Sequence, residues 1–331
     1  MRAMRLRAVR PVEDDPLEST DLPDPSPGPR EIRIRVTACG LCHTDLHEVE
    51  GDLTVPKLPL IPGHQIVGVV DRLGPDATRF RVGDRVGLPW LNWTCGQCPY
   101  CRSGDENLCD RARFTGYHVD GGYAEYTLAP QGFALRLPSG FSDEAAAPLL
   151  CAGIIGYRAL KLSDLNPGER LGLFGFGASA HIAIQVARHW NAEVWVFTRS
   201  PHHREQASKL GAAWVGSAED EPPGVLDRAI SFAPAGRLIP LALSRLRKGG
   251  TLALAGIHLD QIPAMEYALL YGERTIRSVT ASTRKDAEEL LQLANRIPIK
   301  TSIETFPLKD ANRGLRELKA SRITGAGVLA V

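Results

Sequence analysis

The sequence predicts an α/β protein in which a β-rich part precedes a doubly wound parallel sheet. Its 331 residues exceed what one hydrophobic core usually supports, so two domains are expected. Residues 1 to about 145 carry short alternating apolar runs broken by glycine and proline, which is typical of an all-β core. Residues 153 to 280 repeat the order strand, helix, strand, which is typical of a parallel sheet.

The strands of the first part are predicted from period-two patterns. Every second residue of Glu31–Val36 is apolar, which places these side chains on one face of a strand. Similar runs stand at Ile66–Val70 and Tyr123–Leu128, while the proline-rich Asp21–Arg30 is expected to be extended.

The second part alternates apolar runs of strand length with amphipathic runs of helix length. The predicted strands are Leu171–Phe174, Glu193–Phe197, Val225–Ser231, Thr251–Leu254 and Thr275–Val279. The predicted helices are Ala178–Trp190, His202–Leu210, Leu238–Leu246, Lys285–Ile297 and Asp310–Ser321. The last two helices are expected to enclose one short strand.

Composition and charge exclude several classes of protein. The formal net charge of +1 gives no electrostatic case for a nucleic-acid or membrane partner. No run of about 18 apolar residues is present, and the N-terminal residues lack the apolar core of a secretory signal. We therefore expect a soluble, cytoplasmic protein. In a reducing compartment cysteines stay free and are available as metal ligands rather than forming disulfides.

Six of the seven cysteines suggest two zinc sites of different kinds. Four of them stand as C-x-x-C-x-x-C-x7-C within fifteen residues, at Cys95, Cys98, Cys101 and Cys109. Four thiolates can close a tetrahedral zinc site without other ligands, which is typical of structural zinc. Cys42 and Cys151 stand far apart in the sequence and remain for a second site, with histidines near Cys42.

A glycine turn predicts a dinucleotide site. The sequence Gly175-Phe176-Gly177-Ala178-Ser179-Ala180 follows an apolar strand and opens a helix, which is the context that gives a G-x-G-x-x-G/A motif its meaning. Gly177 lets the backbone approach a pyrophosphate at the helix N-terminus, with the amides of Ala178 and Ser179 nearby. The alternative is a tight strand-to-helix turn without a ligand.

The end of the second predicted strand bears on the choice of cofactor. NAD-binding domains usually carry an acidic residue there to bind the ribose hydroxyls, whereas this chain has Thr198-Arg199-Ser200. An arginine without a competing carboxylate favours NADP(H), although NAD is not excluded. The alternative is that Arg199 is a solvated surface charge and that His202 and His203 have no role in cofactor binding either.

Three further motifs complete a resemblance to a known family. They are Cys39-Gly40-Leu41-Cys42-His43-Thr44-Asp45-Leu46-His47, Pro62-Gly63-His64-Gln65-Ile66-Val67-Gly68 and Pro148-Leu149-Leu150-Cys151-Ala152-Gly153. Over its whole length the chain resembles the zinc-dependent medium-chain alcohol dehydrogenases, among them the bacterial and cinnamyl alcohol dehydrogenases. The resemblance implies a GroES-like catalytic domain in residues 1–152, with a structural-zinc lobe at about 90–113. It also implies a Rossmann domain in 153–283 facing the catalytic cleft, and a segment 284–331 that completes the catalytic domain.

The resemblance also implies roles for single residues. It implies that Cys42, His64 and Cys151 hold a catalytic zinc and that the four clustered cysteines hold a structural one. Thr44 and His47 resemble the family's proton relay from the substrate oxygen through the nicotinamide ribose to water.

Each of these residues has a plainer interpretation. His64 could be a core histidine and Cys151 a small buried hydrophobe. His43 faces either the cofactor pyrophosphate or solvent. Cys39 is interpreted as a packing residue, because the family match uses only Cys42 of this pair.

Residue types explain the expected chemistry. Two thiolates and a neutral imidazole cancel the charge of Zn²⁺ and leave a fourth position open, so that the metal can act as a Lewis acid. Asp45 is expected to accept a hydrogen bond from His64, although a surface carboxylate at a helix start is the alternative. Gln65 departs from the family, which usually has Gly-His-Glu, and this puts in doubt any help from a carboxylate in ligand exchange.

The substrate and the partners are less constrained. Trp90, Leu91, Trp93 and Tyr117 occupy places where the family lines its substrate cleft, so an apolar or aromatic primary alcohol or aldehyde is expected, although these residues could equally be core. The alternatives are a non-catalytic zinc-binding interaction protein and a polyol or threonine dehydrogenase, the latter disfavoured by Cys151. A dimer or tetramer is expected, with Leu252–Val279 as candidate interface.

Overall fold

The computed structural model describes all residues from Met1 to Val331, and the chain divides into two compact units. The first unit holds Met1–Cys151 together with Ala281–Val331, and the second holds Ala152–Thr280. The second unit is therefore a continuous segment inserted between the two parts of the first. The sequence predicted the divisions after residues 152 and 283.

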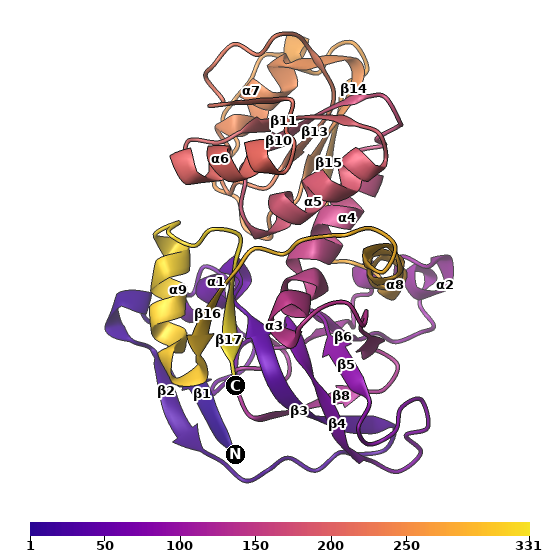
Figure 1. Ribbon diagram of the computed structural model, residues 1–331, viewed down its shortest axis with the longest axis vertical. Helices are drawn as coiled ribbons and strands as arrows, with labels where there is room; N and C mark the ends of the chain where they lie inside the picture. The colour runs from indigo at the N-terminus through magenta and orange to yellow at the C-terminus, as the bar shows by residue number, and fades with distance from the viewer. The chain divides into compact units, whose positions relative to one another are not determined.

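The first unit is built on a seven-stranded mixed sheet with the strand order β16-β17-β3-β4-β5-β9, with β8 also paired to β3 (Figure 1). Its strands and those of two small two-stranded sheets are β1 (Arg2–Leu6), β2 (Leu17–Asp21), β3 (Glu31–Gly40), β4 (Ile66–Leu73), β5 (Arg85–Leu88), β6 (Leu91–Trp93), β7 (Arg113–Phe114), β8 (Tyr126–Pro130), β9 (Leu135–Arg136), β16 (Ile303–Pro307) and β17 (Ala326–Ala330). Its helices are α1 (His43–Glu50), α2 (Pro99–Ser103), α3 (Asp143–Ala146), α8 (Arg284–Ala294) and α9 (Ala311–Lys319).

Strand β3 is the centre of this sheet. Its alternating residues Ile32, Ile34 and Val36 are buried in the core of the unit, as their period-two spacing predicts. The C-terminal end of β3 pairs antiparallel with β17 through Ala38, Cys39 and Gly40, so the last strand of the chain completes the sheet next to the first cysteine motif. Figure 1 shows α9 beside β16 and β17.

The all-β expectation for the first part omitted the helices α1 and α2, and α3 begins at its end. α1 begins directly after Cys42, and the Asp45 side chain accepts from the backbone amide of Cys42 as half of a capping box. Gly51 ends the helix with a φ of 87°, a left-handed conformation that glycine adopts at little cost. This short helix carries several of the predicted site residues.

The second unit is a parallel sheet of six strands in the order β12-β11-β10-β13-β14-β15 (Figure 1). Numbered from the first strand of the unit, this is the order 3-2-1-4-5-6 of the dinucleotide-binding fold. The strands are β10 (Arg170–Phe174), β11 (Glu193–Phe197), β12 (Trp214–Gly216), β13 (Leu226–Ser231), β14 (Leu246–Leu254) and β15 (Thr275–Ser278). The helices are α4 (Ala152–Leu162), α5 (Ala178–His189), α6 (Pro201–Lys209) and α7 (Leu238–Ser244).

The predicted fold class is confirmed in both units. Strands β10 and β11 are apolar and buried along almost their whole length, which is typical of a parallel sheet with both faces covered. The second unit has its own core, in which the rings of Phe174 and Phe197 stack with centroids 4.3 Å apart.

One helical stretch has the length and apolar composition of a membrane span. It runs through Asp143–Leu162, and 61% of its most apolar window is buried inside the protein, as in a helix packed within a protein core.

Candidate active site

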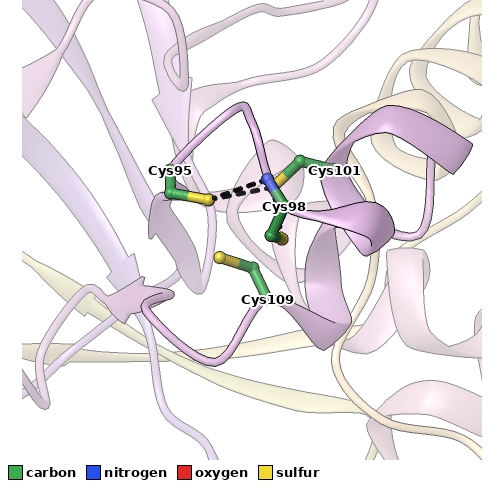
Figure 2. A group of neighbouring side chains, drawn as sticks. All are labelled: Cys95, Cys98, Cys101 and Cys109. Atoms are coloured by element: carbon green, nitrogen blue, oxygen red, sulfur yellow. Dashed lines mark hydrogen bonds between the residues drawn. The ribbon is translucent and has the colours of Figure 1, made fainter.

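Four cysteine side chains converge between β6 and β7 (Figure 2). Their Sγ atoms all lie within 4.8 Å of one another, with 3.9 Å between Cys95 and Cys101 and 3.5 Å between Cys98 and Cys101. In a tetrahedral zinc site with Zn–S bonds of about 2.3 Å, sulfur atoms lie about 3.8 Å apart, whereas a disulfide bond is about 2.0 Å long. The spacing, which includes Cys109, therefore fits a closed four-thiolate metal site.

Backbone amides and one arginine favour the thiolate form of Cys95. The amide of Gln97 is the largest of several hydrogen-bond partners that lower the pKa of Cys95 to about 5, and Arg111 adds to the effect. The amide of Cys98 lies 3.3 Å from the Cys95 sulfur. A cysteine with such a pKa is a thiolate at neutral pH, which is the form that binds metals.

The cysteine lobe is joined to the C-terminal segment by an ion pair. Glu106 stands between two of the cysteines, in the 3-10 turn Glu106–Leu108, and is only 8% exposed. Its carboxylate accepts from the backbone N (2.9 Å), Nε (3.0 Å) and Nη2 (2.6 Å) of Arg284, the first residue of α8. Arg284 also donates to the Gly132 carbonyl and lies 4.4 Å from the centroid of the Phe133 ring.

A second group of possible metal ligands lies at the start of α1. Cys42 precedes α1, His64 precedes β4, and Cys151 follows the 3-10 turn Ala147–Leu150. Their ligand atoms lie within 4.8 Å of one another. The His64 ring is buried with Nδ1 bonded to Asp45, and its Nε2 has no hydrogen-bond partner. A buried imidazole nitrogen without a partner beside two sulfurs fits a zinc ligand.

Asp45 connects two of these ligands. Its Oδ1 accepts from His64 Nδ1 at 3.0 Å and from the Gly63 amide at 3.2 Å. Its Oδ2 accepts from the Cys42 amide at 2.8 Å and from the Tyr123 hydroxyl at 3.0 Å. This fully buried carboxylate, expected as the partner of His64, thus holds both ligand segments.

The charges of the group favour a bound cation. The hydrogen bond from Cys151 lowers the pKa of Cys42 well below its usual range despite burial, and His64 lowers it further. Burial lowers the pKa of His64, but the charges of Asp45 and Cys42 outweigh burial and raise it well above its usual range. Asp45 and the Cys42 thiolate therefore stabilise a positive charge on the His64 ring, and a bound metal ion would supply such a charge in its place.

The predicted relay residues lie on α1. Thr44 is buried, and its Oγ1 is 3.5 Å from the Cys42 sulfur. His47 lies nearly one turn later and bonds Asp52 through Nδ1 at 2.9 Å. Burial lowers the pKa of His43, whose ring centroid is 6.5 Å from that of His47. At neutral pH the His43 ring is therefore uncharged.

Three other buried residues, Gln65, Glu48 and Cys39, are not among the possible metal ligands. Gln65 is buried, donates to the Leu41 carbonyl at 3.2 Å, and has no partner for Oε1. Glu48 is buried without a hydrogen-bond partner for its carboxyl, and burial, followed by the charge of Asp45, raises its pKa well above the ordinary value. Cys39 is buried and belongs to neither group of possible ligands.

Two of the predicted pocket residues lie in an aromatic group at His64. The Trp90 ring meets the His64 ring edge-on at 4.8 Å, stacks on Phe114 at 4.9 Å and lies 5.7 Å from Tyr117. The other two predicted residues differ in exposure. Leu91 is buried in β6, while Trp93 is 36% exposed at the end of that strand.

In the second unit, the glycine turn joins β10 to α5. Gly175 has a φ of 89°, and a side chain there would meet the backbone of Ala233 at 3.0 Å. Gly177 is the N-cap of α5, and nothing lies within 4 Å of the place where its Cβ would stand. Open space beside Gly177 and the free amides of Ala178 and Ser179 at the helix start fit a bound pyrophosphate.

The residues predicted to select the cofactor follow β11. Arg199 is exposed, while Thr198 is buried and accepts from Arg204 Nε at 2.8 Å through its carbonyl. Ser200 precedes α6 and lies 2.8 Å from Nδ1 of His202. A free guanidinium therefore stands at the end of the second strand of the sheet.

Several contributors were missed in the sequence. Tyr123, Phe114, Glu48 and the pair of Glu106 and Arg284 carry no motif of their own. Tyr123, Phe114 and Arg284 make contacts with Asp45, Trp90 and Glu106 that join segments distant in the sequence, whereas Glu48 lies on the same helix as the relay residues. Only the fold brings the distant segments together.

Comparison with known proteins gives matches over the whole chain. Residues 28–139 match the alcohol dehydrogenase GroES-like domain, and residues 180–296 match the zinc-binding dehydrogenase domain. The protein named "Probable alcohol dehydrogenase AdhA" of Mycobacterium tuberculosis is 50% identical, with 100% of this chain and 97% of that protein covered. An alcohol dehydrogenase of Geobacillus stearothermophilus is 39% identical, with 96% of each chain covered.

Solved structures agree with these matches. A cinnamyl alcohol dehydrogenase of Sorghum bicolor has a TM-score of 0.91 at 27% identity, covering 99% of this chain and 97% of its own. Helicobacter pylori CAD complexed with NADP(H) has a TM-score of 0.89 at 25% identity, covering 100% and 99%. Acetophenone reductase of Geotrichum candidum in complex with NAD has a TM-score of 0.91 at 26% identity, covering 100% and 97%.

Proposed function

The chain belongs to the zinc-dependent medium-chain alcohol dehydrogenase family and is an NAD(P)-dependent alcohol oxidoreductase; from that premise we propose its substrates, metals and cofactor preference. The enzyme interconverts primary apolar or aromatic alcohols and their aldehydes, with NADP(H) favoured. One observation carries this proposal: the ligand atoms of Cys42, His64 and Cys151 lie close together. Nε2 of His64 has no hydrogen-bond partner, and the Thr44 hydroxyl lies beside the Cys42 sulfur.

Two zinc ions per chain are proposed. Cys42, His64 and Cys151 would hold the catalytic ion, and the four-cysteine cluster would hold a structural one. When bound, the catalytic zinc supplies Lewis-acid polarisation of the substrate oxygen, and the nicotinamide supplies the hydride acceptor or donor.

The residues of α1 handle the proton. In the proposed relay the Thr44 hydroxyl accepts the proton of the substrate hydroxyl group and gives up its own proton toward His47, and burial keeps bulk water away from this step. His47 holds the outer end of the relay, where its bond to Asp52 orients the ring. A histidine suits this end because its ordinary pKa lies near neutrality.

The aromatic group beside His64 supports an apolar or aromatic substrate. The Trp90 ring meets the proposed ligand His64, and Phe114 and Tyr117 lie against Trp90. Tyr117 is fixed by its hydroxyl bond to the Thr54 carbonyl at 2.8 Å. Stacked rings of this kind favour flat, apolar ligands. The cinnamyl alcohol dehydrogenase similar to this chain acts on an aromatic alcohol, as its name states.

The NADP(H) preference rests on Arg199. Its guanidinium is exposed at the end of β11 and has no carboxylate beside it in the Thr198–Ser200 sequence. Similar structures have been solved with NADP(H) and with NAD, so the shared fold does not decide between the two cofactors. The proposed preference therefore depends on residues of this chain such as Arg199.

We also propose a cytoplasmic homo-oligomer, a dimer or tetramer. The exposed apolar residues Ile257, Tyr267 and Tyr271 lie in the segment between β14 and the edge strand β15, which supports the proposed interface at Leu252–Val279. Sedimentation of the purified protein tests the oligomer, and a monomer at micromolar concentration would contradict it.

Absorbance at 340 nm tests the reaction. A panel of aliphatic, aromatic and polyol substrates is assayed with each cofactor, on protein whose zinc content has been measured. We expect turnover of primary aromatic or long-chain alcohols with NADP and two zinc ions per chain. No turnover with any pair, despite two bound zinc ions, would overturn the proposal, and turnover with NAD alone would overturn its cofactor part.

A matched pair of variants tests the relay. Thr44→Val removes the hydroxyl and is expected to lower kcat by a factor of about 100 or more, because a positioned proton-transfer group contributes on this order. Thr44→Ser retains the hydroxyl and is expected to retain most of the activity. Equal rates for the two variants would contradict the proposed role.

A further inference from the structure

The carboxylate of Asp45 accepts a complete set of four hydrogen bonds, two on each oxygen. A carboxylate has about four lone-pair sites, so no acceptor position is left. Three of the donors belong to the ligand segments themselves: the amide of Cys42, the amide of Gly63 and the ring of His64. The fourth donor, the Tyr123 hydroxyl, comes from a different part of the chain.

Tyr123 is itself held in a fixed position. It is fully buried, and its amide donates to the Pro62 carbonyl at 3.0 Å. Its carbonyl accepts from the amide of Met4 in β1 at 2.8 Å. The tyrosine thus connects the N-terminal strand with the loop that carries His64.

The ring of Tyr123 lies against the backbone of the ligand loop. Gly63 has a φ of 97°, and a Cβ there would stand 2.4 Å from Cδ1 of the Tyr123 ring. Gly122 donates to the Gly63 carbonyl at 2.9 Å, and a Cβ on Gly121 would stand 2.1 Å from that carbonyl. Glycines on both segments therefore permit the close approach that brings the hydroxyl to Asp45.

We propose that Tyr123 is a positioning residue for the metal ligand His64, acting through Asp45. The hydroxyl fixes the carboxylate, and the carboxylate fixes the imidazole through Nδ1, so that Nε2 faces the two sulfurs. Hydrogen-bond partners of metal-bound histidines affect metal affinity by roughly 10- to 100-fold. Tyr123 acts one bond further out, so we expect the lower end of this range. The inference rests on the proposed function, because it takes Cys42, His64 and Cys151 as metal ligands.

Tyr123→Phe is the direct test, because it removes the hydroxyl and keeps the ring against Gly63. The catalytic site is loaded with Co²⁺ in the full chain, and its visible absorption spectrum and its rate of metal release to a chelator are measured. We expect a changed cobalt spectrum and release faster by about 10-fold. Tyr126→Phe is the control, since it removes a tyrosine hydroxyl three residues away, in β8, where the ring contacts Arg33.

A double-mutant cycle separates action through Asp45 from a general loosening of the fold. Asp45→Asn is combined with Tyr123→Phe, and the release rate is measured for all four proteins. We expect Tyr123→Phe to change the release rate by less than about twofold once Asp45→Asn is present. Full additivity, or a spectrum and release rate equal to those of the parent protein, would overturn the inference. A parent protein that binds no Co²⁺ at this site would overturn the proposed function itself.

Discussion

The ion pair between Glu106 and Arg284 leads to a quantitative prediction about the cysteine lobe. Arg284→Met removes the guanidinium but keeps most of the side-chain stem over Phe133, and the bond from the backbone amide to Glu106 is retained. The variant therefore leaves a nearly buried carboxylate without its charged partner. We expect the lobe to open more readily and to release its metal faster.

The magnitude follows from burial. Breaking a fully buried ion pair costs about 3–5 kcal/mol, whereas an exposed pair contributes about 1 kcal/mol or less. Here the Glu106 side chain is 10% exposed and that of Arg284 39%, so solvent screens one partner. We expect a loss of about 2 kcal/mol, which corresponds to roughly 30-fold in an equilibrium constant.

A local measurement suits this prediction because a chain of two units need not unfold in one step. Zinc release from the full-length protein is followed with a chromogenic chelator, with protein whose catalytic zinc is exchanged for Co²⁺ so that the two sites are distinguished. Urea midpoints by circular dichroism give the stability of the whole protein. Release from the lobe of Arg284→Met is expected to be roughly 30-fold faster than from the parent protein.

Lys285→Met is the matched control. Lys285 is the next residue of α8, its side chain is 80% exposed, and it lies 3.9 Å from Glu289. An exposed pair of this kind contributes little, so release is expected to stay within about twofold of the parent value. Equal release rates for the Arg284 and Lys285 variants would refute the reasoning, because burial of Glu106 would then not matter.

Three other perturbations have defined outcomes. Arg199→Ala is expected to raise KM for NADP by about 10-fold or more and to leave KM for NAD nearly unchanged, because only NADP carries the 2′-phosphate; equal changes for the two cofactors would contradict this. Gln65→Glu is expected to speed isotopic exchange of the catalytic zinc by about 10-fold, and unchanged exchange and turnover would show that the position is passive. Bonds to the Asn166 amide and to Arg228 lower the pKa of Glu169 below its ordinary 4.5 even though burial raises it, so its stabilising effect is present above about pH 4.5 and is lost as the pH falls through the lowered pKa. Urea midpoints measured from about pH 6 to about pH 3 should therefore fall more steeply for the parent than for Glu169→Gln, and parallel curves would argue against this.

The elements of the second unit could be predicted from the sequence because their patterns are local. The strand predicted at Glu193–Phe197 coincides with β11, and the predicted helix Ala178–Trp190 differs from α5 by one residue. Strand β12 was missed, since its three residues Trp214–Gly216 are too few to show a period. Helix α4, at Ala152–Leu162, was missed because its glycines interrupt the helical pattern.

In the first unit, pairing between distant segments determines elements that the sequence patterns could not predict. Strand β17 lies between β16 and β3, and β3 is about 290 positions earlier in the sequence. The same holds around the candidate site. The cysteine and histidine motifs named the side chains that converge, whereas the contacts of Tyr123 with Asp45 and of Phe114 with Trp90 depend on segments brought together by the sheet.

The order of units along the chain has a consequence for biosynthesis. Strand β3 and its partner β17 lie about 290 positions apart in the sequence, so β17 is synthesised long after β3. Until β17 has been synthesised, the backbone of Ala38–Gly40 lacks this partner, and an open sheet edge favours aggregation. The inserted second unit is contiguous and can fold before the chain is finished. Chains that lack residues 281–331 are therefore expected to fold their second unit but to leave this edge of the first unit unpaired.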